Sequence, residues 1–372
     1  MTMSDLHDVV VLGATPAGYV AAITLAQHKH SVVLVACPAP ATESPLLDWV
    51  PHDVLDASPV LKSVKSAFET AFKEIIYHSQ DFAQQAEFHS RAVAGYFVRQ
   101  PVLLEALAKK AKTAGVKLKR FARAPHIKLE ENSALLVGEA GQVEGKVLLI
   151  CQDEPDAIMT ELIMPLRITH VEELSICGLD VPLAKSAGQE ALHLVTYGSH
   201  EQIGMFFHSG GMLHVRMLSA LQLAPAGVEQ LSHFIAQLQQ AELLPAKLSL
   251  AKANAAIWHP PGGVALELEA HLAKRMLLVG TAGGFASVLS GQTIDPSVRS
   301  AVVAADVTHK ALNSKQMQLQ ESLAEYKRQW RDELSDRIRL PGTSMKMLLP
   351  IVYSNSAMAA KLARTLLYGE PI

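Results

Sequence analysis

The chain of 372 residues is poor in several kinds of residue, and each shortage narrows the possible functions. It has only three cysteines, Cys37, Cys151 and Cys177, and their spacing is neither that of a disulfide framework nor that of a zinc site. We therefore expect a reducing compartment, the cytoplasm. No pair of its 16 histidines has the spacing of a helical H-E-x-x-H site, so we expect no metal centre.

Charge of one sign and long apolar runs are also lacking. The 33 basic and 36 acidic residues give a net charge of -3 and are spread along the chain, which argues against a nucleic-acid partner. No apolar run reaches the ~18 to 20 residues that span a bilayer, and the first residues do not have the pattern of a signal peptide. Apolar residues still make up 49% of the chain, so a large core is expected. The length predicts two cores and an appendage.

A glycine turn lies near the start of the chain. The apolar run Val9–Leu12 reads as a buried parallel strand, a helix is predicted over 19–29, and a second strand over 31–35. Such a strand–helix–strand unit places the amino end of the helix over a phosphate site. The turn between the first strand and the helix consists of Gly13, Ala14, Thr15, Pro16, Ala17 and Gly18.

A second glycine turn follows about 270 residues later. The strand Arg275–Val279 leads into it, and the helix Pro296–Leu312 comes after it. The turn consists of Gly280, Thr281, Ala282, Gly283 and Gly284. One glycine turn after a strand is weak evidence for a ligand, but two such turns in one chain are stronger evidence.

The two turns together resemble the FAD-dependent oxidoreductases of the geranylgeranyl reductase and aromatic hydroxylase group. In step with that group's second turn and the loop and helix after it stand Gly280, Ala282, Gly284, Gly291, Ile294, Ala304 and Ala305. The segment Tyr326–Leu334 also resembles the Tyr-x-x-x-Trp-Arg helix that closes many of these proteins. The resemblance implies FAD held by Gly13 to Gly18, by Gly280 to Gly284 and by Gly291. It also implies a residue before the middle helix, either Arg99 or Gln100, because the register is uncertain by one.

The predicted fold is α/β, with a Rossmann-type FAD-binding domain, an inserted antiparallel-sheet substrate domain and a helical C-terminal tail. We predict a discontinuous FAD-binding domain over 1–150 and 273–315, a substrate domain over 151–272, and helices over 316–372. The four apolar strands 9–12, 31–35, 147–150 and 275–279 are expected in one parallel sheet. Further predictions are helices over 59–85, 101–114 and 227–240, a meander over 126–150, and antiparallel strands over 191–218 with turns at 198–199 and 210–211.

Four positions depart from the group's pattern. Thr15 replaces the middle glycine, which lets backbone approach a pyrophosphate. No acidic residue follows the second strand, where a ribose would be bound, and Thr281 replaces an aspartate. Cys151-Gln152-Asp153 replaces Ala-Thr-Gly or Ala-Ser-Gly. Each lost hydrogen bond is worth ~1 to 3 kcal/mol, so we expect FAD to bind weakly or to have been lost.

The resemblance implies hydride transfer between flavin and an apolar small molecule, isoprenoid-like or aromatic, lying against the sheet of 191–218. The alternative is a non-catalytic relative that serves as a binding or scaffold protein. Neither the external electron donor nor any catalytic residue is indicated.

Two further segments allow two interpretations each. His259, in a Pro-Pro-Gly-Gly loop, belongs either to a structural turn or to a catalytic loop. The apolar residues of 345–367, with Lys346, Lys361 and Arg364 among them, predict core packing. The minority interpretation is a surface that faces a membrane, in peripheral contact, or a lipid substrate.

Overall fold

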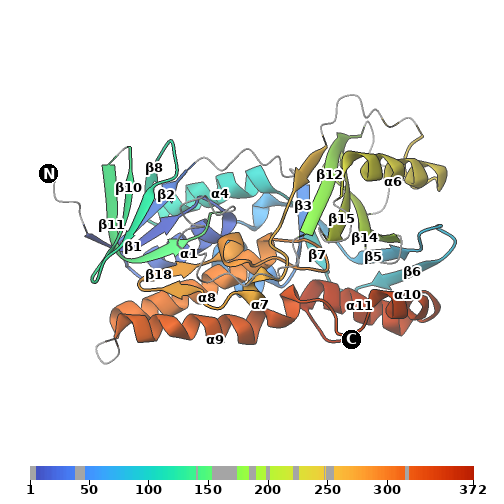
Figure 1. Cartoon of the computed structure of the whole chain (residues 1–372). Helices are drawn as coiled ribbons and strands as arrows, with labels where there is room; N and C mark the ends of the chain where they lie inside the picture. Colours follow the sequence, from blue (N-terminus) through green and yellow to red (C-terminus); the bar gives the residue numbers. More distant parts are fainter. Residues whose placement is uncertain are drawn as a thin grey trace.

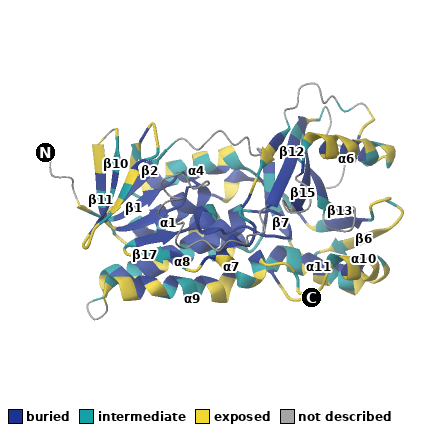
Figure 2. Cartoon of the chain, viewed as in Figure 1, coloured by how far each residue is buried: buried dark blue, intermediate teal, exposed yellow. Residues whose placement is uncertain are grey.

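The computed structural model describes residues 6–37, 47–139, 141–152, 174–183, 190–197, 202–220, 226–246, 248, 255–314 and 318–372. Two large sheets lie side by side in an elongated molecule, and the helices of the C-terminal third run along one side of it (Figure 1). The interior of both sheets is buried, while the outer faces of the surrounding helices are exposed (Figure 2).

The first sheet has a parallel centre in the order β18-β11-β1-β2-β8. Its strands are β1 (Leu6–Leu12), β2 (Val32–Ala36), β8 (Lys117–Arg120), β11 (Gly141–Ile150) and β18 (Met276–Leu278). The prediction that the four apolar runs share one parallel sheet is therefore confirmed. Antiparallel strands are added by β9 (His126–Leu129), β10 (Ala134–Gly138) and β17 (Leu272–Ala273), so the predicted meander is also present.

Helices on one face and the meander on the other keep the parallel strands buried. The helices α1 (Pro16–Gln27), α4 (Gln100–Thr113) and α8 (Ile294–Asn313) share a core with one side of β1. The other side of β1 packs with β9, β10 and β18. A strand covered on both faces has no solvent-exposed side, so polar and apolar residues do not alternate along it. This explains the continuous apolar run of Val9–Leu12.

The second sheet has seven strands in the order β16-β12-β15-β14-β13-β5-β6. These are β5 (Glu74–His78), β6 (Gln85–His89), β12 (Leu174–Pro182), β13 (Ala191–Tyr197), β14 (Gln202–Ser209), β15 (Met212–Ala220) and β16 (Ala256–Trp258). All neighbours are antiparallel except β13 and β5. The predicted turn at 210–211 joins β14 to β15, whereas 198–199 lies outside the described residues.

The predicted helix over 59–85 is wrong. After α2 (Val54–Ala57), the only helical pieces in this range are α3 (Pro59–Ser63) and a 3-10 turn, Lys65–Ala67, and then β4 (Phe68–Phe72), β5 and β6 follow. Aromatic and β-branched residues favour strands, and Phe68 and Phe72 are buried at the two ends of β4. β4 pairs with β7 (Gly95–Arg99), which pairs with β3 (Leu47–Pro51) in a third, small sheet.

The remaining helices complete the two layers. α6 (Val228–Gln240) packs on one face of the second sheet, and α10 (Met345–Ser354) and α11 (Ser356–Tyr368) pack on the opposite face. α9 (Leu319–Ile338) runs beside α8 (Figure 1), and α7 (Val264–Glu267) is a single turn. Within the described residues, no helix combines the length and the apolar composition needed to cross a membrane.

A buried cluster of charges joins α2, α8 and α9. Arg299 on α8 donates to Asp295 at 2.7 Å and pairs with Asp53, which immediately precedes α2, at 2.9 Å. Arg337 on α9 contacts both of these carboxylates and also donates to the carbonyl of Leu367 on α11. Burial raises the pKa of Asp295, whereas the two arginines act in the opposite direction. Removing one partner of such a cluster leaves a buried charge uncompensated.

We expect Arg299→Met to lower the free energy of unfolding by about 3–5 kcal/mol, because Asp295 then keeps only the more distant Arg337. Urea unfolding followed by circular dichroism measures the change. Arg328→Met, which removes a cation from an exposed pair with Glu325, is the control and should change the midpoint little. Adding Asp295→Asn to Arg299→Met should recover part of the loss. Equal effects of the two single variants would contradict the role of the cluster.

Candidate functional site

The first glycine turn lies at the carboxyl end of β1, between β2 and β11. Gly13 has a φ of 112°, and a Cβ at this position would be 2.6 Å from the backbone nitrogen of Gln152. A Cβ on Gly18 would be 2.0 Å from the carbonyl oxygen of Gly13. Both glycines are therefore required by the close approach of β1, α1 and β11, whether or not a ligand binds.

Thr15 has a structural role that the sequence analysis missed. Its hydroxyl donates to the carbonyl of Cys151 at 2.7 Å and accepts from the N–H of Gly18 at 3.1 Å. Thr15 is thus the N-cap of α1 and links that helix to the end of β11. A threonine directly before a proline at the first helical position is a recognisable N-cap signal.

The amino end of α1 fits an anionic group. The N–H groups of Ala14, Thr15 and Ala17 have no acceptor in the part of the chain that the structure describes. Free N–H groups and the positive end of the helix dipole together favour a phosphate or pyrophosphate. The Thr15 hydroxyl bonds to the carbonyl of Cys151 and to the N–H of Gly18, so it does not accept a hydrogen bond from any of these three N–H groups.

The second glycine turn contacts the first one. It forms a single 3-10 turn, η4 (Gly280–Gly283), and a Cβ on Gly280 would be 2.9 Å from the Cβ of Ala17 on α1. The N–H of Gly280 donates to the hydroxyl of Ser300 on α8 at 2.9 Å. The structure therefore brings together the two turns that the sequence singled out. Thr281 is half-buried at this junction.

The buried side chain of His271 supports the second glycine turn. Nε2 of His271 lies 2.9 Å from the carbonyl of Gly283, and the ring packs against Phe285 and Trp330. Burial lowers the pKa of His271 to about 4, so the neutral ring donates this hydrogen bond at neutral pH. Trp330 belongs to the Tyr-x-x-x-Trp-Arg segment, which thereby supports the turn.

The other predicted site residues lie elsewhere. Gly291 has a φ of 66° and packs against the second sheet, where a Cβ would be 2.3 Å from Ile176. Arg99, at the end of β7, pairs with Glu69 at 2.8 Å next to Gly210, and Gln100 is the first residue of α4. The choice between Arg99 and Gln100 therefore stays open.

The loop at His259 packs against the chain that follows the second turn. The N–H of Gly263 donates to the carbonyl of Ala286 at 3.1 Å, and Nδ1 of His259 lies 3.3 Å from the carbonyl of Leu174. These contacts favour the interpretation of this segment as a structural turn.

An apolar crevice lies between the second sheet and the C-terminal helices. It has room for about 20 Å³, enough for roughly one water molecule. The Tyr77 hydroxyl is buried and has no hydrogen-bond partner among the described residues. The crevice is lined by Tyr77, Leu194, Thr196, Ile203, Leu289, Met345, Leu349, Leu362 and Leu366.

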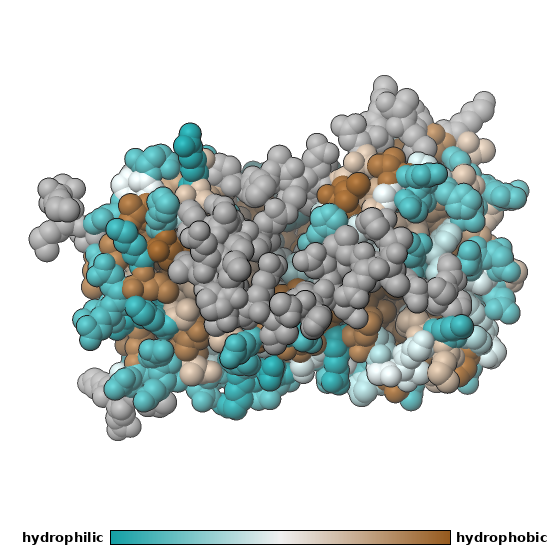
Figure 3. Space-filling view, viewed as in Figure 1, coloured by the Kyte–Doolittle hydropathy of each residue, from teal (hydrophilic) through white to brown (hydrophobic). Residues whose placement is uncertain are grey.

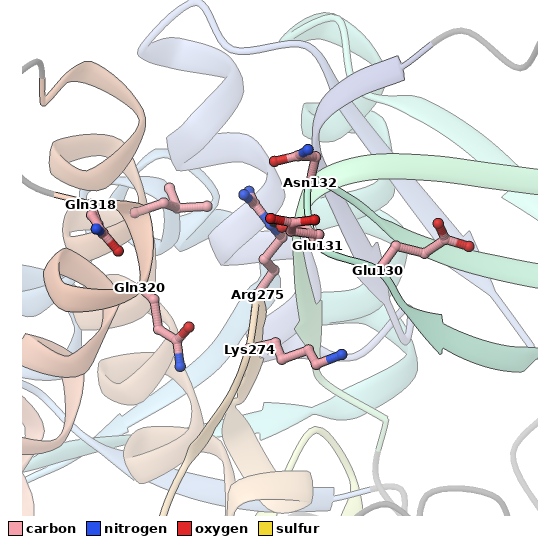
Figure 4. Close-up of a pocket in the computed structure, with 8 residues that line it drawn as sticks. Glu130, Glu131, Asn132, Lys274, Arg275, Gln318 and Gln320 are labelled. Atoms are coloured by element: carbon pink, nitrogen blue, oxygen red, sulfur yellow. Dashed lines mark hydrogen bonds between the residues drawn. The ribbon is translucent and has the colours of Figure 1, made fainter.

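A larger hollow, of about 540 Å³, lies at the opposite end of the first sheet (Figure 4). Its walls carry both signs of charge, and its cations are used in the fold: Arg275 donates to the carbonyl of Glu131 at 2.7 Å and Lys274 to that of Leu129 at 3.1 Å. Ligands of parallel sheets bind at the carboxyl ends of the strands, and this hollow lies at the amino ends. Within the described residues, no group of three or more acidic, histidine or cysteine side chains could hold a metal ion.

Comparisons with known proteins agree with this geometry. Residues 7–151 match the family model described as pyridine nucleotide-disulphide oxidoreductase. No curated protein has a matching sequence. Among solved structures, a geranylgeranyl bacteriochlorophyll reductase-like protein from Thermoplasma acidophilum has a TM-score of 0.77 at 16% identity, covering 99% of this chain and 98% of that one.

Two more solved structures are similar along nearly their whole length. A flavoprotein/dehydrogenase from Cytophaga hutchinsonii has a TM-score of 0.73 at 14% identity, with 97% of this chain and 92% of that one covered. The p-nitrophenol 4-monooxygenase from Pseudomonas putida has a TM-score of 0.68 at 13% identity, with 98% and 96% covered. The chain therefore has the fold of the FAD-dependent oxidoreductases of the geranylgeranyl reductase and aromatic hydroxylase group.

Proposed function

We propose that this chain is a flavin-dependent oxidoreductase that acts on an apolar small molecule held between the second sheet and the C-terminal helices. The observation that carries the proposal is the place of Leu289. This residue lies in the buried loop that follows the second glycine turn, and it also lines the apolar crevice. One loop thus connects the proposed cofactor site with the proposed substrate site.

The protein's own groups would bind and orient the two partners. The N–H groups at the amino end of α1 would hold the pyrophosphate of FAD. The second glycine turn, at Gly280, would also lie close to the pyrophosphate. When bound, FAD supplies the hydride chemistry. The crevice would exclude water, and the Tyr77 hydroxyl would donate to a single acceptor group of the substrate.

The composition of the crevice narrows the class of substrate. Apart from Tyr77 and Thr196, every side chain that lines it is a leucine, isoleucine or methionine. Such walls favour a flexible hydrocarbon with one polar group, of which an isoprenoid alcohol is an example. Because the crevice is nearly filled, α10 or α11 must shift for a ligand to enter. We also propose the cytoplasm as the compartment, since the chain has only three cysteines and their spacing is not that of a disulfide framework.

We expect the purified protein to bind added FAD but to lose it on dialysis. The ribose carboxylate and the aspartate of the second turn are both missing, and each is worth ~1 to 3 kcal/mol. Flavin absorbance before and after gel filtration checks this. Stoichiometric FAD that stays bound would show that main-chain contacts suffice. A complete lack of binding would favour the non-catalytic alternative.

Thr281→Asp should raise the affinity for FAD roughly tenfold to hundredfold, because it restores a hydrogen-bonding carboxylate at the second turn. Thr15→Ser should give a smaller gain, since it removes the methyl group but keeps the cap hydroxyl. Quenching of flavin fluorescence measures both. Thr15→Gly is the comparison that loses the cap, at a cost of a few tenths to ~1 kcal/mol in stability. No gain in either the aspartate or the serine variant would contradict the assigned cleft.

Tyr77→Phe should weaken the binding of an isoprenoid alcohol, geranylgeraniol, about fivefold, because one hydrogen bond is lost. The corresponding hydrocarbon should bind both proteins equally. Competition with a fluorescent fatty-acid probe measures both ligands. Tyr96→Phe, which removes a hydroxyl on β7 away from the crevice, is the control. Equal losses for alcohol and hydrocarbon would contradict the role of the Tyr77 hydroxyl.

A further inference from the structure

The α10 helix is apolar on two faces. Leu349 and Val352 are buried in the core that α10 and α11 form with the second sheet, and Leu348 is buried as well. On the outer face, Met347 is 68% exposed and Ile351 is 46% exposed. A helix that is apolar on both sides normally has a partner on each of them.

The exposed apolar side chains concentrate here. Eight large hydrophobic residues are exposed in the described part of the chain, and three of them, Leu340, Met347 and Ile351, lie within twelve consecutive positions. Figure 3 shows hydrophobic surface at several places on this face of the molecule, with smaller areas at the end that carries α10 and α11. Met347 and Ile351 are four residues apart on α10, so their exposed side chains share one face of the helix.

The C-terminal segment that contains α10 and α11 has a net positive charge. From residue 340 to the end, the chain has three basic residues, Lys346, Lys361 and Arg364, and one acidic residue, Glu370. All three cations are exposed, and none has an ion-pair partner among the described residues. An anionic surface is therefore the complementary partner, and a second copy of this chain would place cations near cations.

The outer face of α10 has the apolar crevice directly behind it. Met345 and Leu349 of α10 and Leu362 and Leu366 of α11 form one wall of that crevice. A helix is about 10 Å across, so an apolar phase on the outside and the crevice on the inside would be separated by one helix.

We propose that α10, with the exposed cations of α10 and α11, docks the protein on a bilayer that contains anionic lipid. Met347 and Ile351 enter the boundary between headgroups and acyl chains, and Lys346, Lys361 and Arg364 contact the headgroups. In this position α10, one of the two helices of which one must shift to admit an apolar ligand to the crevice, faces the lipid bilayer in which such ligands dissolve. The docking itself does not depend on the proposed flavin chemistry.

The test is sedimentation of the full chain with vesicles, without added FAD. We expect binding to vesicles of phosphatidylcholine mixed with phosphatidylglycerol, and much weaker binding to phosphatidylcholine alone. The double variant Met347→Asp, Ile351→Asp should bind at least about tenfold more weakly. Val228→Asp is the matched control, because Val228 is 51% exposed on α6 at the other face of the sheet, and it should leave binding unchanged.

A second set of variants separates charge from insertion. Replacing Lys346, Lys361 and Arg364 by glutamine should reduce binding about fivefold for each cation lost, and only on the anionic vesicles. Wild-type protein that stays in solution with both kinds of vesicle would overturn the proposal. So would self-association, measured by light scattering, that the Met347→Asp, Ile351→Asp variant abolishes, because the face would then bind a second copy. FAD titration of the same variants should be unchanged, which separates this proposal from the proposed function.

Discussion

The contacts of Arg299 with Asp295 and Asp53 join α8 to the chain just before α2, next to the loop that follows the second glycine turn. Asp295 lies in the first turn of α8, directly after the loop that carries Leu289 and Gly291. Arg337, at the end of α9, contacts the same two carboxylates. It also donates a hydrogen bond to the carbonyl of Leu367 on α11. One cluster of charges therefore connects the start of α8, the end of α9 and α11, which contributes to one wall of the apolar crevice. Such charges need fixed geometry to offset their desolvation.

The first sheet could be predicted from sequence because its signals are local and repeated. Continuous apolar runs identified β1, β2, β11 and β18, and the glycine turns identified the strand ends that meet at the site. Both glycine turns lie where predicted, and they touch through Gly280 and Ala17. The roles in binding FAD that the resemblance implies for these residues remain predictions, as do the domain boundaries.

Other features could not be predicted because they depend on distant partners. The segment 59–85 has enough helix-forming residues to suggest a helix, but the strands β4 and β5 gain pairing with β7 and with β13, which is more than a hundred residues away. Compared with the glycine pattern alone, Thr15 is only a departure from the expected glycine. Its hydrogen bond to the carbonyl of Cys151 forms because β11 lies beside β1 in the folded chain, which no local pattern shows. The unpartnered Tyr77 hydroxyl follows from burial by α10 and α11, which no local pattern of β5 encodes.

The pairing of β5 with β13 has a consequence for how the chain is made. β5 and β6 join a sheet whose other strands begin at residue 174, and the first sheet gains β18 only at residue 276. During synthesis at ~5–20 residues per second, β5 waits several seconds for its parallel neighbour. Over that interval the edge of the β5–β6 hairpin and its apolar side chains, Ile75 and Tyr77, are open to other chains. The more slowly the chain is made, the longer this hairpin edge stays open to pairing with other chains before β13 emerges.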